Sequence, residues 1–178
     1  LEPLIRDSAK IIINDPEKLM CVFNLIEMFT MPFEIQDMQF RIIDAITDHL
    51  TETAAKVLIS RKGISRIMKA YNFHAPNYQS SIANLLEAIC DKGMEQFDIP
   101  TIISVALCPF PALQDIGIRT LAALSDNSGD GSKHLDSEFE NHLPFLFEAY
   151  HTTKSLSSSA KNNMLQVLAN LSVRDYLR

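Results

Sequence analysis

One short polar stretch has the residue types and spacing of a calcium-binding loop. Residues 126–131 read D-N-S-G-D-G, so oxygen-bearing side chains alternate ahead of a glycine, as at the start of an EF-hand loop. The twelfth position of such a loop supplies a bidentate glutamate, but here it is Ser137, and Glu138 comes one place late. We therefore interpret residues 127–135 as a loop that connects two helices, and we expect no bound calcium.

Other motifs of catalysis or metal binding are missing from the sequence. The three histidines between residues 134 and 151 lack an H-E-x-x-H or comparable spacing, and no G-x-S-x-G, P-loop, kinase or dinucleotide fingerprint occurs. Cys21, Cys90 and Cys108 are too widely spaced for a zinc or redox pair. We expect each cysteine to be a small buried residue in a reducing compartment, the cytoplasm or the nucleus. We also expect a protein that is not an enzyme and that has no cofactor.

The elements that would position any site follow from a fourteen-residue pattern that recurs four times. Its copies begin at Gln36, Gln79, Gln114 and Lys161, which are 43, 35 and 47 residues apart. Apolar residues recur at offsets 4, 7 and 10 from each start, along one face of an α-helix. They are Phe40, Ile43 and Ile46; Ala83, Leu86 and Ile89; Ile118, Leu121 and Leu124; and Leu165, Leu168 and Leu171. This spacing is typical of stacked helical repeats, in which each unit buries its apolar face against its neighbours.

Prolines, glycines and capping residues divide the chain into helices. We expect helices over residues 3–13, 16–30, 33–50, 52–61, 64–73, 77–91, 99–107, 112–125, 137–150 and 158–172. Asp15, Thr51 and Asp98 are expected N-caps, and Gly63 is expected to end the helix over 52–61. Strand-like alternation does not occur in the sequence. The sequence therefore predicts an all-α fold, a right-handed α-solenoid of about four repeats.

Charge and hydropathy narrow the classes of partner. Twenty-two acidic against sixteen basic residues give a net charge of -6, which disfavours contacts with nucleic-acid phosphates. Ten acidic and five basic residues lie within residues 1–60, so much of the imbalance is concentrated there. Apolar runs fall short of the roughly 18–20 residues that cross a bilayer. We therefore expect neither a nucleic-acid nor a membrane partner.

A mostly polar face follows the same helices at offsets 1, 5, 8 and 12, which share one side of a helix. We call this face the polar lane. With the residue at offset 9 of the last copy, its candidate binding residues are Arg41, Asp44, Asp48, Asn84, Glu87, Asp91, Arg119, Asp126, Gln166 and Asn170. The polar lane is either a solvated face, with Asp37–Arg41 and Asp115–Arg119 as i,i+4 pairs, or a groove for a basic or amphipathic segment.

A second candidate is the basic cluster, formed by Arg61, Lys62, Arg66 and Lys69. Arg66 and Lys69 lie three residues apart and share a helical face. The basic cluster is either a solvated turn or a docking point for an acidic or phosphorylated motif.

Two stretches resemble a known repeat family. Residues 57–71, VLISRKGISRIMKAY, resemble the part of an armadillo repeat in which a short helix gives way at a glycine to an apolar helix. Residues 167–178, VLANLSVRDYLR, resemble the end of the long third helix of such a repeat. The resemblance covers about residues 16–178, and HEAT repeats are the close alternative. It implies units of roughly 16–50, 52–91, 93–126 and 136–173 in a single repeat domain over residues 1–178, which we expect to be part of a longer protein.

The resemblance also implies a function. In armadillo repeats the third helices line a groove in which a repeated asparagine holds the backbone of an extended peptide. The matching offset here carries Ala45, Ala88, Ala123 and Asn170, so we expect a binding mode of its own. We expect a scaffold or adaptor that binds a partner protein on the face of its long helices. The alternatives are self-association and a regulatory domain that acts on an attached enzyme.

Overall fold

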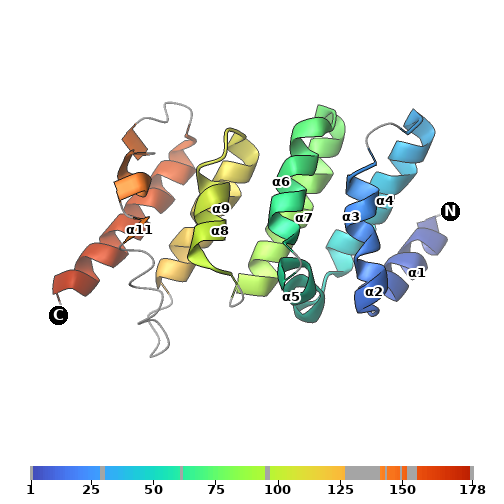
Figure 1. Ribbon diagram of the computed structural model, residues 1–178, viewed down its shortest axis with the longest axis horizontal. Coiled ribbons are helices and arrows are strands. Elements are labelled where there is room, and N and C mark those ends of the chain that lie inside the picture. Colours follow the sequence, from blue (N-terminus) through green and yellow to red (C-terminus); the bar gives the residue numbers. More distant parts are fainter. Residues whose placement is uncertain are drawn as a thin grey trace. The chain divides into compact units, whose positions relative to one another are not determined.

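The regular secondary structure of the chain is helical wherever its structure is described. The computed structural model describes residues 2–28, 31–60, 62–94, 97–126, 141–142, 144–148, 150–151 and 156–176, with the backbone alone at 2 and 171–176. The regular structure in these ranges consists of helices (Figure 1). They group into two compact units, Leu1–Gln96 and Phe97–Arg178. The expected all-α fold is confirmed for the described residues.

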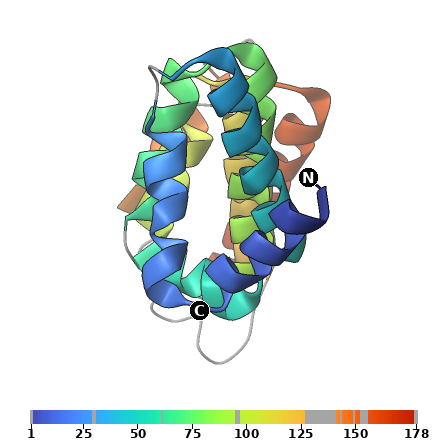
Figure 2. The ribbon, with the colours of Figure 1, turned by 90° about the vertical axis from the view of Figure 1, so that its right-hand side faces the viewer.

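The first unit is a stack of helices in two layers. Its helices are α1 (Glu2–Ile13), α2 (Pro16–Leu19), α3 (Cys21–Ile26), α4 (Phe33–His49), α5 (Glu52–Ser60), α6 (Gly63–Phe73) and α7 (Pro76–Gly93). Helices α3 and α6 lie in one layer, and the longer α4 and α7 lie side by side in the other (Figure 2). Helix α1 packs on α4, and the short α5 packs on α6 and α7. Helices α5, α6 and α7 thus form one complete unit, in which a short helix is followed by a second helix and then by a long third helix.

The second unit contains α8 (Ile99–Ala106), α9 (Pro111–Asp126) and α11 (Ser158–Tyr176). Both α8 and α11 pack against α9. Of the helix expected over 137–150, residues 141–142, 144–148 and 150 are described, and they are helical. The loop 127–135, and with it our interpretation of the calcium-like motif, lies outside the described residues.

The expected buried stripe is correct in the first three copies and shifted by one residue in the fourth. The stripe of α4 at Phe40, Ile43 and Ile46 is buried, as are its counterparts in α7 and α9 except for the half-buried Ala83. In α11 the buried residues are Ala160, Met164 and Val167, whereas Leu165 is 47% exposed. The expectation failed there because apolar residues stand next to each other, and packing on α9 selects the other face. The corrected register places Ala169 at offset 9, so all four copies carry alanine there.

The three expected N-caps are confirmed. The Asp15 carboxylate accepts hydrogen bonds from the backbone N–H groups of Glu17 and Lys18 at 3.0 and 3.3 Å. The Asp98 carboxylate accepts from the N–H of Thr101 at 2.7 Å, and the Thr51 hydroxyl accepts from that of Ala54 at 3.2 Å. The single helix expected over 16–30 is wrong, because a turn at Met20 divides it into α2 and α3.

Gly63 begins α6 and does not end α5 as expected. The residue with the left-handed backbone is Lys62, at φ 59°. A Cβ atom on Gly63 would overlap the carbonyl oxygen of Leu58 and the ring of Phe23. Glycine is therefore required here because α5, α3 and α6 meet too closely for any side chain.

The cysteines follow expectation at two of three positions. Cys90 and Cys108 are buried, and burial raises the pKa of the Cys108 thiol. Cys21 is exposed, since it lies on the outer side of α3 while Val22 and Phe23 turn inward. No helix within the described ranges combines the length and the apolar character that a membrane crossing requires.

Two leucine-to-alanine variants test the assigned stripe. Leu86 in α7 is fully buried, so Leu86→Ala should lower the free energy of unfolding by about 2–5 kcal/mol through lost burial and a cavity. Leu165→Ala makes the same chemical change at an exposed position and should cost under about 1 kcal/mol. Urea denaturation measures both values. Equal losses in the two variants would contradict the register assigned to α11.

Candidate functional site

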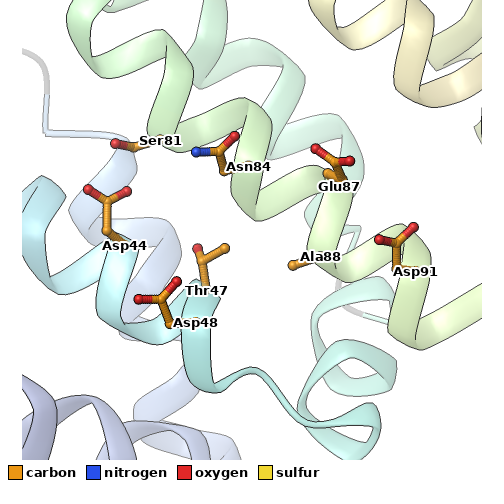
Figure 3. A pocket seen from close by; sticks show the side chains of 8 residues that line it. All are labelled: Asp44, Thr47, Asp48, Ser81, Asn84, Glu87, Ala88 and Asp91. Carbon is orange, nitrogen blue, oxygen red and sulfur yellow. The ribbon is translucent and has the colours of Figure 1, made fainter.

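A groove of about 400 Å³ runs between α4 and α7 in the first unit. Its walls are Asp44, Thr47 and Asp48 from α4, and Ser81, Asn84, Glu87, Ala88 and Asp91 from α7 (Figure 3). We call it the acidic groove, because four of these side chains are carboxylates and none is lysine or arginine. The groove exists because the two helices run side by side, and each turns polar residues toward the other above its buried stripe.

Five residues of the polar lane are brought together in this groove. They are Asp44, Asp48, Asn84, Glu87 and Asp91. Glu87 is half-buried, and the other four are exposed. Residues at equivalent offsets of two copies of the pattern therefore lie on one surface.

Three of the four groove carboxylates are uncompensated among the described residues. The salt bridges among the described residues involve other acids, so Asp44, Asp48 and Asp91 have no ion-pair partner there. Carboxylates one helical turn apart repel one another, and a cation between them lowers that energy. A concave surface of one charge also concentrates oppositely charged ligands.

Arg41 of the polar lane lies outside the groove. Its Nε atom is 3.0 Å from Oδ2 of Asp37 on the same helix, and both side chains are about half exposed. This is the i,i+4 pair expected for a solvated face, and such exposed pairs contribute little to stability. Arg41 therefore does not neutralise the groove.

In the second unit, the polar-lane residues of α9 are exposed, whereas those of α11 form hydrogen bonds. Arg119 and Asp126 are exposed on α9. Asn170 donates a hydrogen bond to the Ser125 hydroxyl at 3.0 Å and accepts one from Gln166 at 2.7 Å. Gln166 and Asn170 thus belong to a polar contact that joins α11 to α9.

The basic cluster is divided by a contact that the sequence does not reveal. Arg66 donates from Nε and Nη2 to the two carboxylate oxygens of Glu27, at 2.6 and 2.5 Å. The guanidinium carbon also lies 4.4 Å from the centre of the Phe23 ring, so Arg66 ties α6 to α3. Lys62 and Lys69 are exposed, and Arg61 lies outside the described residues. Because Arg66 is engaged, the four residues do not form a free basic site.

Three groove residues were absent from the sequence-based candidates. Thr47 follows Asp44 by three residues, Ser81 precedes Asn84 by three, and Ala88 follows Asn84 by four. Helical spacing of three or four would have found them. They were missed because they stand at offsets 11, 2 and 9, outside the offsets 1, 5, 8 and 12 that define the polar lane.

The spacing of the groove carboxylates bears on metal binding. Among the described residues, no three histidine, cysteine, aspartate or glutamate side chains are grouped closely enough to hold a metal ion. The groove carboxylates are therefore spread along the two helices as a charged surface.

The Glu27–Arg66 pair gives a testable dependence on pH. The hydrogen bonds from Arg66 lower the pKa of Glu27 below its ordinary value of 4.5. The pair therefore contributes stability above that value, and the contribution is lost as the pH falls through the lower pKa of the folded state. Glu27→Gln should cost about 1 kcal/mol at neutral pH and flatten the loss of stability in acid. Urea denaturation at several pH values measures this.

The matched control is Glu52→Gln. Glu52 pairs with Lys56 on α5, but that pair is exposed and screened, so its loss should change the pH profile little. Parallel profiles for wild type and Glu27→Gln would contradict the role assigned to the pair.

Comparison with known proteins adds two distant structural neighbours. The sequence matches no protein-family model and no curated protein. An engineered protein of known crystal structure is similar with a TM-score of 0.41 and 14% identity, over 97% of this chain and 90% of its own. A designed armadillo repeat protein in complex with the peptide (KR)4 is similar with a TM-score of 0.37 and 10% identity, over 94% and 91%.

Proposed function

We propose that this chain is a non-catalytic scaffold for protein–protein interaction, and that the acidic groove binds a basic or amphipathic segment of a partner protein. The observation that carries the proposal is the gathering of four carboxylates, without a lysine or arginine, around one groove. A cytoplasmic or nuclear location belongs to the proposal, since the three cysteines are free thiols.

The size of the groove suits a segment. Its volume of about 400 Å³ lies in the range of sites that bury a few side chains of a ligand. Asp44 and Asp48 are one helical turn apart, which is about 6 Å. Lysines two residues apart on an extended segment, or four apart on a helix, would match that spacing. The partner therefore needs two basic side chains on one face.

Neutralising the groove tests the proposal. Asp44→Asn with Asp48→Asn should weaken binding of a fluorescent lysine-containing peptide of about ten residues by roughly three- to tenfold, because two exposed charge pairs are lost. Fluorescence anisotropy measures the affinity. Wild-type binding should also weaken as salt is added.

The control changes net charge by the same amount elsewhere. Asp7→Asn with Glu17→Gln lies on α1 and α2, outside the groove, and both side chains are exposed. Thermal melts establish that both double variants fold. Equal weakening in the two would mean that the peptide responds to total charge, and the groove would lose its assigned role.

Self-association is a second candidate, supported by exposed apolar side chains on α1. Leu4 and Ile11 are seven residues apart on one face of the helix and are largely exposed. In this case the chain should dimerise in sedimentation velocity at high concentration, and Leu4→Ser with Ile11→Ser should restore the monomer. A wild-type monomer at all concentrations would remove this candidate.

A further inference from the structure

Aromatic side chains gather near the N-termini of α4 and α7, the two helices that form the acidic groove. Phe33, the first residue of α4, is 66% exposed, and its ring centre lies 6.5 Å from that of Tyr78. The Tyr78 ring in turn stacks on Phe40 at 4.4 Å. Phe33, Phe40 and Asp44 share one face of α4, since they are separated by seven and then four residues. Phe33 is therefore the exposed aromatic residue at the start of the α4 face that carries Asp44 further along.

The aromatic end also has unused hydrogen-bonding capacity. Tyr78 is 6% exposed, and its hydroxyl has no hydrogen-bond partner among the described residues. The same holds for Oε1 of Gln39, which is buried on α4 beside Phe40. Buried polar atoms are paired in the large majority of cases. The unpaired Tyr78 hydroxyl is an exception at the aromatic end, whereas the Gln39 amide lies toward Met28, with Nε2 3.3 Å from its sulfur.

We propose that the partner segment carries an apolar anchor as well as basic residues, with the anchor against Phe33 and Tyr78. This inference rests on the proposed function of the acidic groove. Phe33 precedes Asp44 by eleven residues, which is about 16 Å along the helix. An extended chain covers that distance in about five residues. The segment therefore has one leucine or aromatic side chain about five residues from its nearest lysine or arginine.

Charge selects this occupant over others. Phosphates of membranes and nucleic acids would be repelled by the four carboxylates. A second copy of the chain carries a net charge of -6, and its Arg66 is already bonded to Glu27. An extended basic segment with one apolar side chain complements both parts of the surface.

Three synthetic fluorescein-labelled peptides test the anchor on the full chain. One has two lysines among serines and glycines; the others add a leucine about five residues before or after the lysines. One leucine peptide should bind about fivefold more tightly than the peptide without leucine. That advantage should persist at high salt, because an apolar contact is not screened.

Two serine variants locate the effect. Phe33→Ser should abolish the advantage of the leucine peptide and leave the affinity of the lysine peptide unchanged. Ile35→Ser removes an exposed apolar side chain from another face of α4 and should change neither affinity. Thermal melts of both variants check folding.

The outcomes separate this inference from the proposed function. If neither leucine peptide binds more tightly, or if the advantage survives Phe33→Ser, the anchor is wrong. The acidic groove would still stand if binding of the lysine peptide required Asp44 and Asp48. If none of the three peptides binds, both proposals fail.

Discussion

The packing of α7 against three helices at once is the constraint on which the first unit depends. Ile82, Leu85, Leu86 and Ile89 are fully buried where α7 meets α4, α5 and α6. Burial of each such side chain contributes about 1.5–3 kcal/mol, so rotation of the helix would be costly. Because three sides of α7 pack against other helices of the first unit, its polar residues lie on the remaining side. That side carries the α7 wall of the acidic groove, so the hydrophobic core sets the positions of its carboxylates.

Helix α4 forms the other wall of the acidic groove, and its orientation is likewise set by a buried apolar stripe. Its stripe at Phe40, Ile43 and Ile46 is buried, which fixes Asp44 and Asp48 beside the stripe and facing α7. Neither helix has a base in position to neutralise these acids, and Arg41 is held by Asp37. The resulting repulsion is tolerable because most of the carboxylates are exposed to water. An acidic groove thus arises without any distortion of the repeat.

The spacing of residues along the sequence predicted features that depend on a single helix. It failed for features that depend on packing between helices far apart in the sequence. The stripe of α4 was correct because its apolar residues have one consistent period. In α11, Met164 and Leu165 are adjacent apolar residues, so the sequence allows two faces and packing on α9 chooses between them. The Glu27–Arg66 bond spans 39 residues and leaves no local signal. The acidic groove was found in part because five of its residues repeat at helical spacing, whereas Thr47, Ser81 and Ala88 lie at other offsets of the pattern.

A titration of the chain, labelled with ¹⁵N, with a lysine-containing peptide locates the binding surface most directly. Amide chemical shifts report contact residue by residue in the folded protein. The acidic groove predicts that the largest changes fall at Asp44–Asp48 of α4 and Ser81–Asp91 of α7. Changes that are absent, or that concentrate instead on the outer residues of α1 or on Lys62 and Lys69 of the opposite layer, would contradict it.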